Sequence, residues 1–491
     1  MFIALKRLRA TTLYLVTAFC LAGLYLFFIY PTPEFPIYNK DDGALFVTMA
    51  LNMVNLGRYT VDTFPYIEYG RHATWPPVFP ASLALVIALF GHSWWAIKLL
   101  MVSFAGAALS LLFALWSDER EGRAAVFITA LSPAFFLFAH HPMSELAYLC
   151  LIAATLMLLS KTRHWRMALL AGAVASMAFF TRGYAVTFVP AAILYFALQR
   201  EISLRERLLS ALAFAVPLVL SIIFWKFYTG YIVANYPVDA ITSHFGTGSG
   251  MLGSLFRDPV SYLQRFWWQD VRFTLPLFVP AISLKTALAN DFLAVISGMI
   301  LLCCIIGWLR CLFLRRGILE IWLPIAIAFL FVPSNASFRY WFTFLPFLIY
   351  YFLQFASLLD GRAWLPIKFF SYARFSLFLS MGFGLALLLF MPDNLRYIES
   401  SWKDFGNVAQ WAGKHLPANS VVIERWGAQF YASSGIFAIN PENFGERRDE
   451  VLSTASEIFV LCSSAHSICE NMKVGMTVYS AGSYELKKYG E

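Results

Sequence analysis

Long apolar runs recur along most of this 491-residue chain, and they constrain its fold more than any other feature. A helix needs roughly 20 apolar residues to cross the ~30 Å hydrocarbon core of a bilayer. About eleven runs approach that length, which predicts a polytopic α-helical membrane protein. The expected spans are 10–30, 96–116, 124–139, 146–160, 167–181, 184–199, 208–228, 292–310, 318–333, 340–357 and 375–392.

The composition agrees with this class. Only 13% of the residues are charged and 59% are hydrophobic, whereas soluble proteins are about one quarter charged. An ordinary water-soluble enzyme is therefore excluded. The net charge of +8 indicates which membrane side the loops occupy and gives no reason to expect a nucleic-acid partner.

The basic residues predict the orientation. With the N-terminus in the cytoplasm, cytoplasmic loops follow the even-numbered spans, and each of these loops carries two or three cations, as the positive-inside rule expects. The cations are Arg120 and Arg123; Lys161, Arg163 and Arg166; Arg200, Arg205 and Arg207; Arg310, Arg315 and Arg316; and Arg362, Lys368 and Arg374. Counting 77–91 as a further span would reverse the later loops. We therefore expect 77–91 to be a re-entrant or surface-lying helix on the outer side of a bacterial-type inner (plasma) membrane.

The character of the chain changes after residue 392. We predict a transmembrane domain over 1–392, and a small extracytoplasmic (periplasmic) α/β domain over 393–491. In the latter, 404–415 has a helical pattern, whereas 421–423 and 458–461 resemble strands. Cys462 and Cys469 lie in this part, where an oxidising environment allows a disulfide.

The outer loop 31–95 carries two adjacent carboxylates, Asp41 and Asp42, followed by a helical stretch over 44–56. One of them could act as a general base next to the membrane. The alternative is that Asp42 caps the helix, since Asp is favoured at that position. The polar residues Thr48, Asn52 and Asn55 follow helical spacing, which predicts an amphipathic helix lying in the interface.

A longer pattern in the same loop resembles a known family. It consists of Asp42, Phe46, Ala50, Met53, Gly57 and Tyr59, followed by Pro76-Pro77 and Leu89-Phe90-Gly91. These residues resemble the first-loop signature of the GT-C membrane glycosyltransferases, in the branch of the protein O-mannosyltransferases and lipid A aminoarabinose transferases. The resemblance implies a GT-C-like fold and places Asp42 at the catalytic position. The family's Asp-Glu pair is Asp42-Gly43 here, so the role of Asp41 stays open.

Later outer-side residues extend the resemblance. Glu145 is the carboxylate of the connection 140–145, and His141 takes the position that is aspartate in the aminoarabinose enzymes. Glu145 is therefore either a second catalytic carboxylate or a cap or buried partner. Similar enzymes carry Lys or Arg in the turn at Arg182, which implies contact with a lipid phosphate; the alternative is snorkelling to the interface. Arg339 recurs in the family too, or it is an interface anchor, and Arg71 is a further phosphate candidate.

The outer loop 229–291 contributes Asp270, which we group with Tyr59 and His141 as acceptor-side candidates. The sequence Trp267-Trp268-Gln269-Asp270 resembles the Trp-Trp-Asp motif of oligosaccharyltransferases. It is interrupted and lies elsewhere in the chain, so we treat that likeness as coincidence. No spacing of His and Cys predicts a metal site, and a divalent metal stays open.

The resemblance implies an inverting glycosyltransferase that uses a polyprenyl-phosphate sugar donor and a lipid, glycan or protein acceptor among membrane lipids. The sequence has no phosphate-binding glycine-rich loop of the nucleotide-dependent kind. The rival hypotheses are a transporter or lipid flippase, a glycan ligase or polymerase of the cell envelope, and a non-catalytic scaffold. A transporter is expected to carry ionisable groups at mid-depth in repeated, interrupted helices, whereas here they concentrate in the outer loops.

Overall fold

A computed structural model describes part of the chain. The described residues are 42–61, 75–162, 164–235, 291–330, 338–359, 376, 380–382, 384–385, 404–417, 419–424, 427–446, 448–463, 469, 472 and 474–490. The expected span 10–30, most of 375–392 and residues 236–290 of the large outer loop lie outside them.

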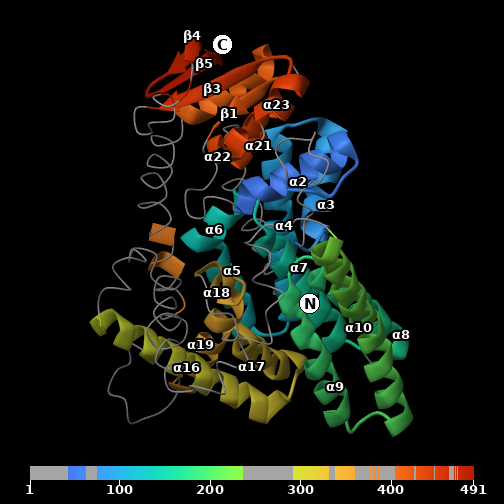
Figure 1. The fold of residues 1–491 in the computed structure, drawn as a ribbon. Coiled ribbons are helices and arrows are strands. Elements are labelled where there is room, and N and C mark those ends of the chain that lie inside the picture. The colour runs from blue at the N-terminus through green and yellow to red at the C-terminus, as the bar shows by residue number, and fades with distance from the viewer. Residues whose placement is uncertain are drawn as a thin grey trace, which may run out of the picture.

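Helices make up the first part of the molecule (Figure 1). In chain order they are α2 (Asp42–Leu56), α3 (Val78–Phe90), α4 (Trp94–Leu115), α5 (Arg120–Ala130), α6 (Pro133–Ala139), α7 (Ser144–Ser160), α8 (Trp165–Phe179), the 3₁₀ helix η1 (Gly183–Thr187), α9 (Phe188–Leu198), α10 (Leu204–Asn235), α16 (Asp291–Arg315), α17 (Ile318–Leu330), α18 (Phe338–Phe342) and α19 (Leu345–Leu359).

Three helices of the described residues are long and apolar enough to cross a membrane, by length and composition: Trp94–Leu115, Leu204–Ile232 and Asp291–Arg315. At 1.5 Å per residue, the 22 residues of α4 reach roughly 33 Å, about the thickness of the hydrocarbon core. By contrast, the 13 residues of α3 reach only roughly 20 Å. That 77–91 stays on one side of the membrane remains a prediction.

Two expected spans are not single helices, and that part of the prediction was wrong. The run 124–139 is divided between α5 and α6. Pro133 opens α6, and a proline disfavours helical geometry at the residue before it. The run 340–357 is likewise divided between α18 and α19. In both places the sequence is one continuous apolar run, whereas the backbone forms two separate helices.

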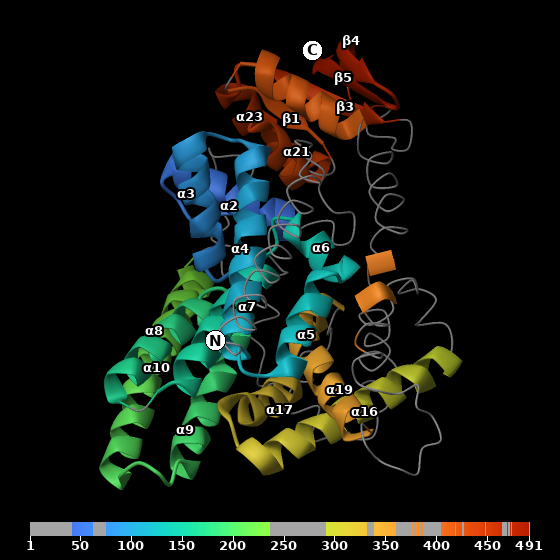
Figure 2. The same ribbon diagram turned by 180° about the vertical axis from the view of Figure 1, so that it is seen from behind.

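The connections sort into two groups at opposite ends of the helical part (Figures 1 and 2). At one end, Arg315, the last residue of α16, pairs with Glu119 before α5. At the same end, Glu206 in the first turn of α10 accepts a hydrogen bond from the Trp165 backbone, 3.1 Å. At the other end, the Val78 backbone donates to the Phe180 carbonyl, 2.9 Å. Among the described residues, the basic connections thus share one end, as the charge pattern predicts, while 362–374 lies outside them. Which end faces the cytoplasm stays a prediction.

The C-terminal part contains a five-stranded sheet in the order β2-β1-β3-β5-β4. The first three strands pair in parallel and the last pairings are antiparallel. The strands are β1 (Val421–Ile423), β2 (Phe437–Ile439), β3 (Ile458–Ser463), β4 (Val474–Ala481) and β5 (Tyr484–Tyr489), with a helix at 404–415, α21 (Gly427–Ser434), α22 (Pro441–Glu446) and α23 (Arg448–Thr454). The local predictions for 404–415, 421–423 and 458–461 are confirmed, and Cys462 forms a disulfide with Cys469.

The sheet is not packed independently of the helices. Phe405, Phe430 and Leu486 belong to the same hydrophobic core as the transmembrane helices and α2. A second, smaller core lies on the other side of the sheet and includes Val421 and Val460. The C-terminal part, named the α/β segment below, therefore shares its packing with one end of the helical part. The boundary at residue 392 stays a prediction.

This packing corrects the expectation for α2. An interface-lying amphipathic helix presents its polar side to water, but Thr48 and Asn52 are completely buried. Their side of α2 is covered, and the side chain of Asn52 bonds to Tyr431 of α21. Thr48 and Asn52 thus lie in a contact within the protein, whereas Asn55, the third polar residue of the pattern, is exposed.

The predicted orientation can be tested by cysteine labelling of intact cells. Arg58 and Met476 are exposed at the end that bears the α/β segment, and Glu201 is exposed in a basic connection. We expect a membrane-impermeant maleimide to label Arg58→Cys and Met476→Cys but not Glu201→Cys, since the reagent reaches only the outer side.

The unsubstituted protein, with its own cysteines, is the control for background labelling. Permeabilised cells should label all three variants. Labelling of Glu201→Cys alone in intact cells would reverse the orientation.

Candidate functional site

The first residue of α2 lies next to the connection between α6 and α7. A Cβ added at Gly43 would lie 3.6 Å from both the ring and the carbonyl oxygen of Pro142, and 3.8 Å from the Met143 sulfur. Glycine therefore allows the helix to approach this backbone closely. Asp42 precedes it as the first residue of α2, so its backbone is placed beside the connection, while its side chain lies outside the described residues.

Aromatic contacts fix the middle of α2. The ring of Phe46 packs edge-on against Trp75 at 5.4 Å and against Phe79 at 5.1 Å between centroids. The Tyr59 hydroxyl donates to the Trp75 carbonyl, 2.7 Å, and burial raises the pKa of Tyr59 well above its ordinary value. Tyr59 thus stays protonated and, in this structure, closes the first loop.

A buried ion pair lies at the centre of the site. Glu145, in the first turn of α7, is completely buried, and its Oε1 lies 3.0 Å from Nη1 of Arg182. Arg182 separates α8 from η1 and is only 8% exposed. Snorkelling predicts a guanidinium that reaches water, so the burial of Arg182 argues against that alternative. The buried-partner alternative for Glu145 agrees with this geometry.

Two tyrosines complete the surroundings of Arg182. Its guanidinium carbon lies 4.9 Å from the ring centre of Tyr340, within the range of a cation–π contact. Tyr340 in turn packs edge-on against Tyr184 at 5.4 Å. A guanidinium has five N–H donors in one plane. The carboxylate of Glu145 and the ring of Tyr340 therefore orient the group while leaving donors that can bind an anion.

Two histidines precede α7 in the same connection, and the charge of a lysine in α4 acts on both. Burial, with the nearby positive charge of Lys98, lowers the pKa of both His140 and His141 to about 3. Both imidazoles are therefore neutral at physiological pH. Lys98 is itself buried in α4 and was missed in the sequence analysis. Its signal was present, because a cation inside an apolar span is costly and indicates function by default.

The predicted site residues are thus partly brought together. Four of them meet at the end of the helical part nearest the sheet. They are Asp42, of which only the backbone is described, and His141, Glu145 and Arg182. Arg339 lies in α18 beside Tyr340, but its side chain is outside the described residues. Asp41, Arg71 and Asp270 are outside them as well. Among the described residues, no group of three His, Cys, Asp or Glu side chains could hold a metal ion.

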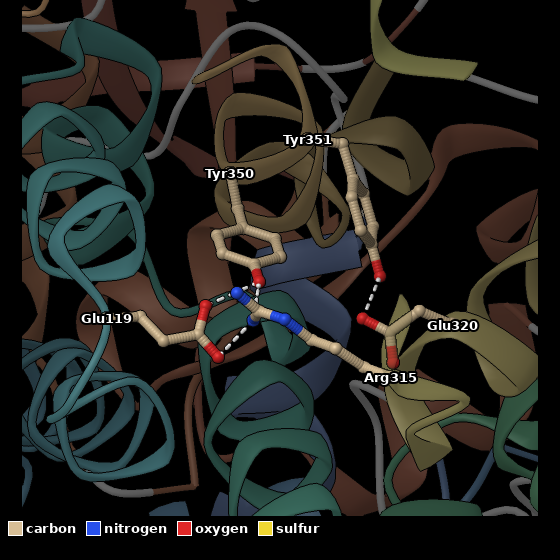
Figure 3. Close-up of polar contacts among 5 residues, drawn as sticks. All are labelled: Glu119, Arg315, Glu320, Tyr350 and Tyr351. Carbon is tan, nitrogen blue, oxygen red and sulfur yellow. Dashed lines mark hydrogen bonds and ion pairs between the residues drawn. The ribbon is translucent and has the colours of Figure 1, made fainter. Parts of the chain in front are cut away.

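A second polar cluster lies at the opposite end (Figure 3). Arg315 pairs with Glu119 and donates to the Tyr350 hydroxyl, 2.7 Å, which itself donates to the other Glu119 oxygen, 2.6 Å. Tyr351 donates to Glu320, 3.3 Å. Tyr350 also stacks on Trp116 at 4.6 Å. These contacts tie the loop before α5 to α16, α17 and α19, and the mutual bonding indicates a structural role.

Together, the helical layout and the covering sheet define a class: a membrane protein with the GT-C glycosyltransferase fold. The structure matches ArnT from Cupriavidus metallidurans bound to undecaprenyl phosphate with a TM-score of 0.59 at 12% identity, covering 97% of this chain and 98% of that chain. The apo form of ArnT gives the same TM-score and identity, with 98% of each chain covered.

Two further comparisons agree. Archaeal oligosaccharyltransferase AglB from Archaeoglobus fulgidus, in complex with an inhibitory peptide and a dolichol-phosphate, matches with a TM-score of 0.50 at 12% identity, over 92% of this chain and 69% of that chain. The family model described as dolichyl-phosphate-mannose-protein mannosyltransferase matches residues 74–225, which include Glu145 and Arg182. No curated protein sequence matches the chain. The resemblance to GT-C glycosyltransferases expected from the first loop is confirmed.

Removing one member of the buried pair should cost more stability than removing both. Arg182→Ala leaves a buried carboxylate without its cation, which typically costs about 3–5 kcal/mol. The Glu145→Ala/Arg182→Ala double variant removes both charges and should recover part of that loss. Thermal unfolding of the purified variants in detergent measures both. If the double variant loses the sum of the two single losses, the two side chains do not stabilise each other.

The opposite cluster should affect stability alone. Tyr350→Phe removes one hydroxyl and keeps the stacking ring, so we expect about 1–2 kcal/mol lower stability from the lost bond to a carboxylate. A lower thermal midpoint with unchanged activity per folded molecule checks this. A loss of activity at unchanged stability would instead move the candidate site to this end.

Proposed function

We propose that this chain is an inverting glycosyltransferase that moves a sugar from a polyprenyl-phosphate-linked donor to a lipid, glycan or protein acceptor at the outer face of the membrane. The observation that carries the proposal is the buried Glu145–Arg182 pair, set beside the start of α2 on a GT-C fold. The fold alone does not give the function. The residues that the fold brings together support this proposal.

Arg182 suits the phosphate of the donor. Its planar donors match phosphate oxygens in pairs, and Glu145 and Tyr340 already hold the guanidinium in one orientation. Such a prepared cation stabilises the negative charge that grows on the leaving phosphate. Arg71 and Arg339 are the further candidates for phosphate contacts. Glu145 then acts through Arg182, by holding it.

Asp42 is the proposed base. The acceptor hydroxyl oxygen attacks the anomeric carbon, its proton passes to the carboxylate, and the bond from that carbon to the phosphate oxygen breaks. Polyprenyl phosphate leaves with the bonding electrons, and attack from the opposite side inverts the anomeric centre. Gly43 approaches Pro142 closely, and Pro142 lies three residues before Glu145. This supports a site in which Asp42 and Glu145 are neighbours. His141, Tyr59 and Asp270 remain candidates for the acceptor side.

The adjacent carboxylates provide a matched test. We expect Asp42→Asn to lower sugar transfer by at least about 100-fold, since a general base contributes roughly 10²–10⁴ in rate. Asp41→Asn, one residue away with the same change in charge, should keep most of the activity. The assay follows release of polyprenyl phosphate from sugar-charged polyprenyl phosphates by the protein in vesicles, with thermal midpoints to confirm folding.

Full transfer by Asp42→Asn would remove Asp42 as the base, and loss of transfer only in Asp41→Asn would assign that role to its neighbour. In cells, a deletion strain should lack one sugar from its envelope glycans, read by mass spectrometry. A wild-type protein that moves intact lipid-linked glycans across vesicles without transferring sugar would favour the flippase.

A further inference from the structure

The contact between α2 and the α/β segment contains a buried hydrogen-bond network. The Tyr431 hydroxyl of α21 donates to Oδ1 of Asn52, 3.1 Å. The Asn52 amide nitrogen donates to the carbonyl and the hydroxyl oxygen of Thr60, 3.0 and 3.2 Å. Tyr431 and Asn52 are both completely buried, and Thr60 is nearly so. One asparagine thus joins α2 to the chain that follows it at Thr60 and to α21, which lies 379 residues further on.

Apolar side chains make up much of the contact in which this network lies, and the buried polar residues Thr48, Gln429 and Ser433 lie on the same two helices. Met49 and Leu51 of α2, and Phe430 and Ala432 of α21, are buried in the same core. An apolar contact would be enough to hold two such surfaces together, but it would tolerate sliding. Buried hydrogen bonds have a fixed geometry, and leaving a buried partner unbonded is costly. The Tyr431–Asn52 bond therefore selects one position of α2 against the α/β segment.

A second contact lies beside the first. The imidazole of His92, in the turn before α4, forms a hydrogen bond with the Ala432 backbone, and a Cβ added at Gly435 would lie 3.7 Å from its Nδ1. Thus α21 touches both α2 and the turn that leads into α4. With two points of contact, the α/β segment is less free to rotate against the helical part than it would be with the Tyr431–Asn52 bond alone.

We propose that Tyr431 and Asn52 are positioning residues, through which the α/β segment sets the place of Asp42 for sugar transfer. Asn52 lies ten residues after Asp42, about 15 Å along one continuous helix. The other end of α2 rests on Pro142, so a shift at Asn52 moves the start of the helix against the Glu145 connection. This inference rests on the proposed function for its chemistry.

The first test measures the hold on α2 without using activity. In the full-length protein in nanodiscs, Tyr431→Phe should speed amide hydrogen exchange in 42–56 by about fivefold, the effect of losing one hydrogen bond. Asn52→Leu should act in the same direction. Tyr479→Phe is the matched control, since it removes a hydroxyl in the same segment from a ring that stacks on Trp411, and it should leave 42–56 unchanged.

The second test measures transfer. Tyr431→Phe should lower kcat by about fivefold with an unchanged donor KM, because Arg182 is untouched. The Tyr431→Phe/Asn52→Leu double variant should be no worse than Asn52→Leu alone, since both remove the same bond. Unchanged exchange in 42–56, or faster exchange with unchanged kcat, would overturn the proposal. A wild type that transfers no sugar overturns the proposed function, while the exchange data still decide whether the bond holds α2.

Discussion

Burial of charge in an apolar environment is the constraint on which the end of this structure near the sheet depends. An isolated carboxylate or guanidinium in the position of Glu145 or Arg182 would be prohibitively costly. Pairing makes both tolerable, but it requires the start of α7 and the turn after α8 to stay at hydrogen-bonding distance. The pair therefore fixes two helices against each other, and Tyr340 brings α18 to the same point.

The two ends of the helical part use similar residue types differently. At the end away from the sheet, Glu119, Arg315 and Tyr350 bond mainly to one another, and Arg315 and Glu119 are partly exposed. Such a cluster fastens loops. At the end near the sheet, the charged groups are deeply buried, and the neighbouring imidazoles are kept neutral by burial and Lys98. Under the proposed function the site binds an anion and moves a proton in a dry environment, which favours the second arrangement.

Much of this was predictable from the sequence, for physical reasons that differ by feature. The apolar runs predicted α4, α10 and α16, because a helix that crosses a bilayer must be long and apolar. The cations predicted which loops lie at the same end, because positive charge gathers on one side of a membrane. The breaks at Pro133 and before Pro346 were hidden, because proline is common in membrane helices and its local effect depends on packing. Arg182 and Glu145 were each recognised as charges out of place, but their pairing was only one of the alternatives left open. The two lie 37 residues apart, and nothing in the intervening sequence specifies their distance.

The role of Asn52 was missed because its position in the sequence pattern has a second interpretation. Asn52 was interpreted as part of a water-facing stripe, since a polar residue on an apolar helix has that reading in the absence of a partner. Its partner, Tyr431, comes 379 residues later, from a segment that composition separated from the membrane part. The two parts share one hydrophobic core, so the α/β segment is not independent of the helical part. The helix that carries Asp42, the proposed base, cannot be held by lipid, which offers no fixed contacts, so its position must come from protein on its other side. In this fold the α/β segment occupies that side, and a buried asparagine makes the contact specific.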